Sequence, residues 1–524
     1  MKRARHVTSA VALATVVPVL ALGGALAPAD AAAATTCLDK PVTIVASQEV
    51  TSGTEGDDVV AMTPGDWNTF DALGGDDTIC LAVPDSFSGS ETGEIVGFVT
   101  AGSGDDVVVN ESSSNSSHLS VLLGSGDDTF TGSSSTRVVE HVYADSVAIG
   151  SNGLDKPPAG SQRDVIHMGG GADGPPEDQH PWTDWPFTDT VWSVAPRGGL
   201  NNDDITFGPG GALLHQRGAM APEARLDFSA ADWAGVHLPN PGAAEPVARG
   251  ELLLDNATRR ATVDGRQVMT WEGHVDAFQL GSQGSRDWPF PASFIGSDDD
   301  ELLTFPNGTF GDVRMGGGDD RLGRSYSFAS RVNTLPARSV DGGPGNDAVS
   351  LHNRCTSLTI RLTKRMTCDG DSLALPGFEG VQVLSRGVRQ RLLIVGSRGD
   401  DFAEVLYAPR VTFRGRGGAD EAVINGNTVR AAGGPGADRL TIKAEDVVAR
   451  GGPGADRIHL VRPAYFHPPQ RLVALGGPGP DVLRGPRHAY AARLVGGPGR
   501  DRADGGGGGR DHCDAEVTRR CKLG

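Results

Sequence analysis

The sequence lacks the short motifs that identify several common enzyme classes. It contains no H-E-x-x-H and no C-x-x-C, which argues against a zinc protease of that type and against a zinc site built on paired thiolates. It has neither a G-x-S-x-G nucleophile elbow nor a P-loop. After residue 33, no segment approaches the roughly 18 consecutive apolar residues that a membrane span needs. No catalytic motif is therefore recognisable, and no span is expected in the remaining chain.

A helix-favouring composition is also missing. The 524 residues include 74 Gly and 33 Pro, and an interior Gly costs about 1 kcal/mol relative to Ala and a Pro about 3 kcal/mol. This excludes a mostly helical fold. Gly does not recur at every third position, which excludes collagen. The 38% of hydrophobic residues suffice for a sizeable core, and the net charge of −19 favours cations over nucleic acid as partners.

The first 33 residues predict a secretory signal peptide. Lys2, Arg3 and Arg5 precede an apolar run over 11–22, and small residues follow at 29–31. Removal of this segment leaves a net charge of about −21. We therefore expect an extracellular protein without a membrane span.

The six cysteines of an exported chain predict disulfide bonds. Sequence alone permits fifteen pairings. The two closest pairs predict local bridges and leave the third by elimination: Cys513–Cys521, Cys355–Cys368 and Cys37–Cys80.

A nonapeptide repeat organises the second half of the chain and recurs in altered form in the first. Its clearest copies are 433–441 and 451–459, which read GGPGADRLT and GGPGADRIH. Further G-G-P-G-x-D copies begin at Gly342, Gly476 and Gly496. Shorter or altered copies lie at 56–58, 75–77, 104–106, 126–128, 318–320, 399–401 and 418–420. So many copies are hard to obtain by chance.

This pattern resembles the hemolysin-type (RTX) calcium-binding repeat, G-G-x-G-x-D-x-U-x, in which U is a large apolar residue. The resemblance is specific from about residue 341 to the C-terminus, good over 53–131 and 295–323, and poor over about 132–294. It implies a parallel β-roll, in which each Gly-rich loop supplies calcium ligands and each x-U-x tripeptide forms a short strand.

Elementary geometry supports this architecture independently of the resemblance. Gly at the first, second and fourth positions is expected to allow positive φ, while Pro at the third fixes one φ between them. Leu440 and Ile458 would each provide the inward side chain of a short strand. The aspartates at 401, 420, 438 and 456 are separated by 19, 18 and 18 residues, or about two nonapeptides. The spacing predicts one loop per coil, stacked on one edge. Segment 442–448 in the opposite half-coil lacks the pattern, so metal is expected mainly along that one edge.

The stacked loops favour calcium as the bound ion. Parallel strands lie about 4.8 Å apart, and calcium takes oxygen ligands at about 2.3–2.6 Å, whereas magnesium requires about 2.0–2.1 Å and retains its waters. Without a cation, carboxylates about 5 Å apart repel one another by roughly 1 kcal/mol per pair in water. We therefore expect the C-terminal array to be loose without calcium and to fold on binding it.

The candidate metal ligands are motif aspartates and glycine carbonyl oxygens. The aspartates are Asp58, Asp77, Asp106, Asp128, Asp320, Asp347, Asp401, Asp420, Asp438, Asp456, Asp481 and Asp501. The glycines are Gly433, Gly436, Gly451, Gly454, Gly476 and Gly479. At 298–300 an Asp replaces the fourth-position Gly, and Asp300 is taken as the motif aspartate that pairs with Asp320. The alternative is turn chemistry alone, because Gly, Pro and Asp dominate turns in general.

The predicted organisation is an all-β parallel β-roll or β-helix solenoid. Residues 34–140 form an N-terminal repeat-containing part, 141–290 a degenerate Trp-rich part, 291–505 the C-terminal repeat array, and 506–524 a disulfide-closed cap. Six of the seven Trp lie between residues 182 and 288. They could form a sugar-binding platform, although a packing role is more common, and 181–187 reads as an inserted loop.

The expected function is calcium-ion binding by a secreted repeat protein. Two alternatives remain open. One is a polysaccharide-acting β-helix enzyme, a lyase or epimerase with structural calcium. The other is an adhesin that contacts extracellular polysaccharide or the cell-surface matrix. Acidic and basic side chains clustered in a groove near 182–288 would favour the enzyme.

Overall fold

The computed structural model describes residues 36–46, 51–62, 68–81, 97–112, 117–135, 138–144, 149–150, 153–154, 163–170, 188–195, 200–238, 250–281, 292–304, 310–323, 337–385, 389–461, 471–487, 491–507 and 511–521. The predicted signal peptide and the segment 181–187 lie outside these residues. The described part of the chain contains strands and no helix, so it contains no helix that could span a membrane.

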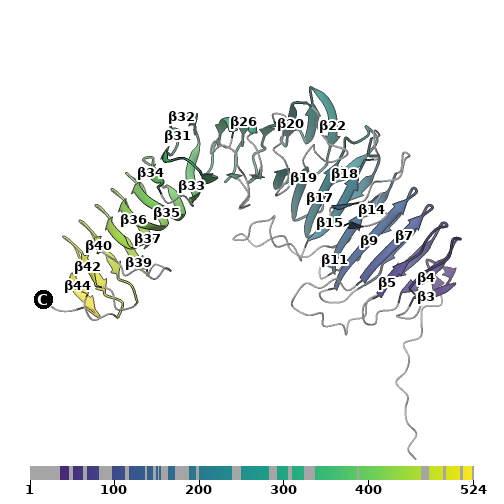
Figure 1. The fold of residues 1–524 in the computed structure, drawn as a ribbon, viewed down its shortest axis with the longest axis horizontal. Coiled ribbons are helices and arrows are strands. Elements are labelled where there is room, and N and C mark those ends of the chain that lie inside the picture. The colour runs from purple at the N-terminus through teal and green to yellow at the C-terminus, as the bar shows by residue number, and fades with distance from the viewer. Residues whose placement is uncertain are drawn as a thin grey trace, which may run out of the picture.

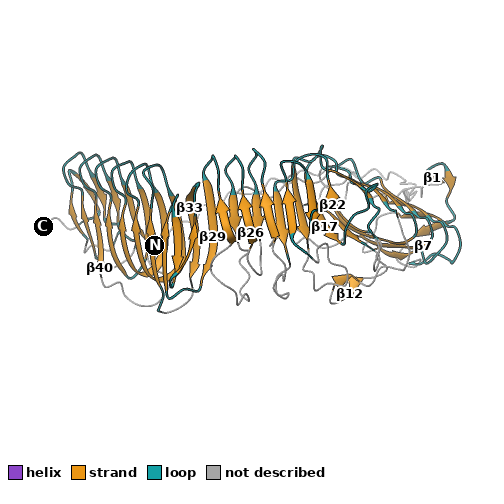
Figure 2. Ribbon diagram, turned by 90° about the horizontal axis from the view of Figure 1, so that it is seen from above, coloured by secondary structure: helices purple, strands orange, loops and turns teal. Residues whose placement is uncertain are grey.

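The chain winds into a parallel β-solenoid, which confirms the predicted fold class. The coils stack along an arch, with the N-terminal coils in one limb, the C-terminal coils in the other and residues near 250–315 at its crown (Figure 1). Seen from above, the strands run across the arch and the connecting loops gather along its two edges (Figure 2).

One long parallel sheet runs through the whole solenoid, and its strands pair in chain order. In spatial order its strands are β5 (Asn68–Asp71), β7 (Gly97–Ser103), β9 (Ser117–Ser125), β11 (Val138–Tyr143), β15 (Asp189–Val194), β17 (Gly211–Arg217), β19 (Trp233–Leu238), β23 (Ala277–Leu280), β25 (Leu302–Thr304), β27 (Arg321–Gly323), β29 (Asp347–Asn353), β33 (Phe378–Ser385), β35 (Phe402–Arg414), β36 (Glu421–Ala432), β37 (Arg439–Lys443), β39 (Arg457–Val461), β41 (Val482–Arg484), β43 (Arg502–Asp504) and β45 (Val517–Arg519).

The opposite face is built in three stretches. The first contains β3 (Ile44–Ala46), β4 (Val59–Met62), β6 (Thr78–Leu81), β8 (Val107–Asn110), β10 (Thr129–Thr131), β14 (Val165–His167), β16 (Asp204–Thr206) and β18 (Arg225–Asp227). The second contains β20 (Leu252–Asp255), β24 (Ala292–Ile295), β26 (Phe310–Arg314) and β28 (Ala337–Asp341). The third contains β30 (Ser357–Arg361), β34 (Arg391–Val395), the second halves of β35 and β36, β38 (Asp446–Arg450), β40 (Arg471–Leu475), β42 (Ala492–Val495) and β44 (His512–Asp514).

Short antiparallel strands decorate the solenoid. They are β1 (Thr36–Cys37) with β2 (Lys40–Pro41), β12 (Ile149–Gly150) with β13 (Gly153–Leu154), β21 (Arg260–Val263) with β22 (Arg266–Thr270), and β31 (Arg365–Cys368) with β32 (Asp371–Ala374).

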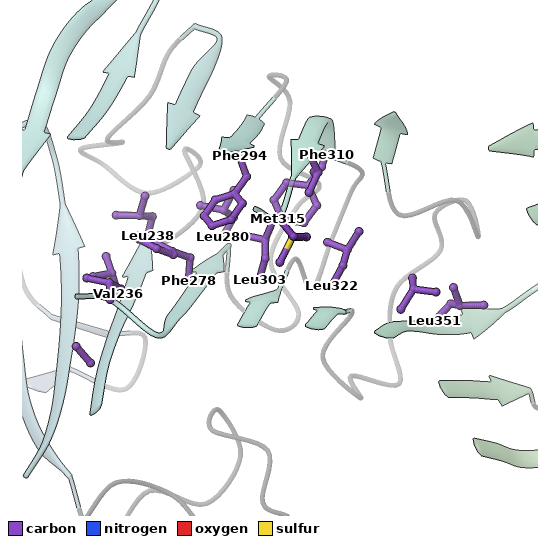
Figure 3. Close-up of a cluster of buried hydrophobic side chains, with 14 of the residues drawn as sticks. Val236, Leu238, Phe278, Leu280, Phe294, Leu303, Phe310, Met315, Leu322 and Leu351 are labelled. Carbon is purple, nitrogen blue, oxygen red and sulfur yellow. The ribbon is translucent and has the colours of Figure 1, made fainter. Parts of the chain in front are cut away.

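The core is a column of inward side chains, one from each strand of the long sheet. Val236, Phe278, Leu303 and Leu322 occupy successive register positions and are fully buried (Figure 3). Leu440 and Ile458 continue the same column and are buried, as predicted from the repeat. Alternation of apolar and polar residues thus fixes the register, because a slip by one residue would expose this column.

The three predicted disulfides are present. Cys37–Cys80 ties β1 to β6 at the first coils, and Cys513–Cys521 closes the last described coil. A solenoid exposes its core and strand edges at each end unless something covers them. The terminal disulfides therefore brace the positions where the stack is weakest.

Candidate metal centre

The repeat loop folds around its aspartate for two different steric reasons. In the loop 433–438, Gly434 and Gly436 have φ of 125° and 152°, values that other residues rarely adopt. Gly433 does not have positive φ, so that part of the prediction is wrong. A Cβ at Gly433 would instead lie 2.0 Å from Oδ2 of Asp438. The first glycine is required because the buried carboxylate packs directly against it.

The motif aspartates of the C-terminal array stack in one column, as their spacing predicted. The backbone N–H of Asp420 donates to Oδ1 of Asp438 at 2.9 Å, and that of Asp438 donates to Oδ1 of Asp456 at 2.9 Å. The same bond links Asp401 to Asp420 at 3.0 Å, Asp456 to Asp481 at 2.9 Å and Asp481 to Asp501 at 2.9 Å. We call this column the C-terminal ladder.

The C-terminal ladder has further acidic neighbours, of which the motif identified Asp320 and Asp347 but not Glu301, Glu379 and Glu516. Glu516 accepts the N–H of Asp501 at 2.7 Å after the last repeat. Upstream, Glu301, Asp320, Asp347 and Glu379 form a shorter series linked by bonds of 2.8, 2.9 and 3.3 Å. Glu301 occupies the ladder position that the sequence assigned to Asp300. A carboxylate directly before an apolar strand residue is the signal that would have found it.

A second column of the same kind lies in the first half of the chain. Asp58, Asp77, Asp106 and Asp128 each donate their N–H to the carboxylate of the next coil, at 2.8, 2.8, 2.8 and 3.1 Å. The last acceptor is the carboxylate of Asp164, and the backbone N–H of Asp164 donates in turn to the carboxylate of Asp203 at 3.2 Å. The sequence missed these last two, because long insertions separate them from the regular copies. We call this column the N-terminal ladder.

The two ladders lie on opposite edges of the solenoid. Strands of the long sheet are parallel, so their starts share one edge and their ends share the other. The aspartates of the C-terminal ladder come just before long-sheet strands such as β37. In the N-terminal ladder, Asp77, Asp106 and Asp128 follow the long-sheet strands β5, β7 and β9 and come just before strands of the opposite face. The prediction that the motif loops stack on one edge is confirmed within each ladder. It is wrong for the whole chain, because the two ladders lie on different edges.

The N-terminal loops carry a further row of exposed carboxylates. Asp57, Asp76 and Asp105 each accept the N–H of the equivalent residue in the next coil, at 3.0, 3.0 and 2.9 Å. In this exposed row the donor N–H belongs to the later coil, whereas in the buried row it belongs to the earlier coil. The C-terminal loops have Ala437 and Ala455 at the same position. The N-terminal edge is therefore more acidic than the C-terminal edge.

The second oxygen of most ladder carboxylates is buried and has no hydrogen-bond donor among the described residues. This holds for Oδ2 of Asp77, Asp106, Asp128, Asp320, Asp347, Asp420, Asp438, Asp456, Asp481 and Asp501. Oδ2 of Asp58 and of Asp401 accepts the N–H of Thr54 and of Ser397, and in Asp401 it is Oδ1 that has no donor among the described residues. A buried charge without a partner is costly, so it is normally paired, protonated or bound to a metal.

Burial perturbs the protonation of these carboxyls. It raises the pKa of Asp106 to about 7, that of Asp420 to about 8 and that of Asp456 to about 7, and neighbouring carboxylates add to the effect. The ladder hydrogen bond from the preceding coil acts in the opposite direction. Near neutral pH the columns therefore hold protons unless another cation compensates their charge.

The candidate glycine carbonyls face neighbouring coils: those of Gly433, Gly451 and Gly476 face the preceding coil, and those of Gly436 and Gly454 face the next one. Those of Gly433, Gly451 and Gly476 accept backbone N–H groups of the preceding loop at 2.8, 2.9 and 2.9 Å. The carbonyl of Gly436 lies against Gly454, whose Cβ, if present, would be 1.6 Å away, and that of Gly454 lies against Gly479 in the same way. A carbonyl oxygen has two lone pairs, so one hydrogen bond leaves an oxygen able to contact a cation.

The acidic side chains alone do not form a metal cage. No group of three or more His, Cys, Asp or Glu side chains converges on one point in the described part of the chain. An ion between two coils would contact at most two ladder carboxylates and would take its remaining ligands from carbonyls or water. This donor set consists of oxygen only, which suits a hard cation.

Two of the described Trp residues of the middle region pack against other rings of the solenoid. Trp192 stacks between Tyr143 at 4.3 Å and His215 at 4.8 Å, measured between ring centroids. Trp271 is buried and lies 5.8 Å from the ring of Phe278. Trp182, Trp185 and Trp288 lie outside the described residues. Packing between coils therefore accounts for the ring of Trp192, and burial in the core accounts for that of Trp271.

No protein-family model matches the chain, and a search of curated proteins returned no match.

Proposed function

We propose that the two ladders bind Ca²⁺ and that this binding stabilises the solenoid outside the cell. One observation supports the proposal above the others. Ten buried carboxylates have one oxygen held by the backbone of the preceding coil and a second oxygen without a donor among the described residues. A column of this kind requires positive charge.

Protons and metal ions compete for this role. Adjacent ladder carboxylates are separated by about 4.8 Å, the spacing of parallel strands. If both are ionised, they repel one another by about 3 kcal/mol at an effective dielectric constant near 20. Partial protonation relieves this repulsion, and a divalent cation relieves it further because it attracts both carboxylates.

The donor set favours calcium over other divalent ions. Calcium accepts six to eight oxygen ligands at flexible angles and about 2.3–2.6 Å, so two loops about 4.8 Å apart can contact it together. Magnesium needs shorter bonds and near-octahedral geometry. The loops offer neither sulfur nor imidazole, which disfavours zinc and copper. Bound calcium would supply charge compensation, while the loop residues supply the oxygens and exclude water.

Binding would be coupled to folding. The Gly-rich loops carry a high ordering entropy, and the native loop places like charges in register. Free energy of calcium binding therefore contributes to the folding free energy of each coil. A chain exported from a low-calcium cytoplasm would gain this stabilisation only outside.

Thermal unfolding and circular dichroism test the proposal. The chain without residues 1–33 is dialysed against chelator, then measured with chelator, with Ca²⁺ and with Mg²⁺ at equal ionic strength. We expect Ca²⁺ to raise the unfolding midpoint and the β signal more than Mg²⁺ does. Identical curves under all three conditions would refute the proposal.

A polysaccharide-acting enzyme is the second candidate, favoured by a groove of about 410 Å³ at the crown of the arch. Its lining includes Glu251, Asp264, Asp312 and Arg314, a mixture of acids and a base on β20, β24, β26 and their neighbours. Incubation with a uronate polymer would show chain cleavage or epimerisation, and Asp264→Asn with Asp312→Asn should abolish it. An unaltered polymer would exclude this activity for that substrate.

A further inference from the structure

A second and larger groove, of about 520 Å³, lies on the outer face of the last coils. It is lined by five consecutive long-sheet strands, β37, β39, β41, β43 and β45. Each strand contributes one arginine: Arg439, Arg457, Arg484, Arg502 and Arg519. The groove is therefore a cationic feature in a chain whose net charge is −19.

The strand register places these arginines in two adjacent rows. Arg439 pairs with Arg457 in the first row, and this row continues through Val482 to Arg502. Where valine interrupts the first row, the second row supplies the arginine instead, as at Arg484. Every coil thus presents one guanidinium, and successive coils lie about 4.8 Å apart. Over five coils this gives a regular cationic track roughly 19 Å long.

Most of these guanidinium groups have no acidic partner in the part of the chain that the structure describes. Among the described residues, no carboxylate lies within salt-bridge distance of Arg457, Arg484, Arg502 or Arg519. Asp504, the acid in the groove, is paired with Arg520. The arginine side chains are exposed, so the track is open to solvent.

The corresponding positions in the N-terminal coils differ in charge. The residues that directly follow ladder aspartates there are Val59, Thr78, Val107 and Thr129. Outward arginines in register are therefore a property of the last coils and not a general consequence of the repeat.

We propose that this groove binds one chain of an anionic polysaccharide that carries carboxylate or sulfate groups. Arginine suits these groups, because its planar fork donates two parallel hydrogen bonds to a carboxylate or sulfate. A linear polymer with regularly spaced anionic sugars can contact one arginine on each coil. Val482 and the exposed Val517 also line the groove and offer apolar surface to sugar C–H groups.

Single-stranded nucleic acid fits the groove less well. Proteins that bind it combine positive charge with aromatic side chains on which bases stack. Among the described residues, the only ring that lines this groove is the imidazole of His459. Burial and the nearby Arg484 and Arg487 lower the pKa of His459, so it contributes no charge at neutral pH.

The groove is distinct from the calcium ladder, although the two are adjacent in sequence. Asp438 and Asp456 are buried in their loops, whereas Arg439 and Arg457 directly follow them and point outward from the strands. Polysaccharide binding through arginine needs no metal and should persist in chelator. Its failure is therefore distinguishable from failure of the calcium proposal.

The test compares two triple variants of the chain without residues 1–33. Arg457→Ala, Arg484→Ala and Arg502→Ala together remove the track. The control, Arg391→Ala, Arg414→Ala and Arg450→Ala, removes equal charge from exposed positions on β34, β35 and β38 of the opposite face. Affinity for polygalacturonate and for heparin is measured in chelator at increasing salt, with dextran as the neutral polymer.

We expect the parent chain and the control variant to bind an anionic polysaccharide with similar affinity. The track variant should lose at least tenfold, or about 1.4 kcal/mol, with a shallower dependence on salt because fewer ion pairs form. Far-UV circular dichroism must be unchanged in both variants. A variant that unfolds is replaced by Arg→Gln substitutions at the same positions, which keep the side-chain stems.

Several results would overturn this proposal. They are equal affinity of the track variant and the parent, equal loss in the control variant, and binding that appears only when Ca²⁺ is added. Binding of dextran as tight as that of polygalacturonate would show that charge is irrelevant. Tighter binding of single-stranded DNA or polyglutamate than of either polysaccharide would assign the track to another class of partner.

Discussion

Substitution of Asp438 separates the two roles that its carboxylate combines. Oδ1 accepts the backbone N–H of Asp420, and Oδ2 has no donor among the described residues. Asp438→Asn keeps an acceptor oxygen for the ladder bond but removes the charge. Asp438→Ala removes both. The difference in stability between the two variants therefore measures the contribution of the hydrogen bond. The response of the Asn variant to calcium measures the contribution of the charge.

The expected magnitudes follow from the position of Asp438 between Asp420 and Asp456. In chelator at pH 8, the Asn substitution removes repulsion from both neighbours, worth about 1 kcal/mol per pair in water and about 3 at an effective dielectric constant near 20. We expect Asp438→Asn to unfold at the same or a higher urea concentration than the parent. Asp438→Ala leaves a buried N–H unsatisfied and should be about 1–3 kcal/mol less stable than Asp438→Asn.

Calcium should reverse the order of stability, so that the parent becomes more stable than the Asn variant. A site filled at one hundred times its dissociation constant stabilises the parent by about 2.7 kcal/mol, and the Asn variant loses a ligand of two successive coils. Urea denaturation followed by circular dichroism, with chelator or with Ca²⁺, measures both effects. Asp371→Asn, on the exposed hairpin strand β32, is the matched control and should change neither.

Two results would refute this reasoning. If Asp438→Asn is as unstable as Asp438→Ala in chelator, the carboxylate charge is compensated within the protein. If calcium stabilises the Asn variant as much as the parent, Asp438 is not a ligand.

Three further predictions concern steric fit, pH and the first coils. Gly436→Ala should prevent stacking of its coil, because its Cβ would lie 1.7 Å from the carbonyl oxygen of Gly418. The control Gly370→Ala, at a position with φ of 118° and no atom within 4 Å of the added Cβ, should lower the free energy of unfolding in chemical denaturation by only about 1 kcal/mol. Burial raises the pKa of ladder carboxyls toward neutrality, so the folded chain binds more protons than the unfolded chain between pH 4 and 8. In chelator the unfolding free energy should therefore fall as pH rises through this window, and a rise would contradict the uncompensated charge. Replacement of Cys37 and Cys80 by Ser, which opens a loop with a separation of 43 residues, should destabilise the first coils by about 4 kcal/mol, seen as faster amide exchange there than in the last coils.

The regular array was predictable because one coil corresponds to a constant number of residues. From Asp401 to Asp456 the spacing stays at 18 or 19 residues, so a pattern in the sequence becomes a column in space. The inward positions of Leu440 and Ile458 followed from the same period. The short separations in sequence likewise sufficed to predict the disulfide pairs, because each of the two short loops can close within one coil.

The middle of the chain was not predictable in the same detail. Intervals of 36 and 39 residues precede Asp164 and Asp203, because insertions lengthen the coils without disturbing their register. Glu301 replaces an aspartate and is reached by the same ladder bond, so a search for Gly-x-Asp could not find it. The edge on which a ladder lies depends on whether the repeat loop precedes or follows the long-sheet strand of its coil. The repeat motif alone does not contain that information.

Calorimetric titration of the chelated chain without residues 1–33 tests the central proposal most directly. Ca²⁺ and Mg²⁺ are added in separate experiments, in two buffers of different ionisation enthalpy. We expect saturable binding of several Ca²⁺ ions, weaker binding of Mg²⁺, and release of protons from the ladder carboxyls as calcium replaces them. Absence of saturable heat for calcium, or binding without proton release at neutral pH, would contradict this expectation.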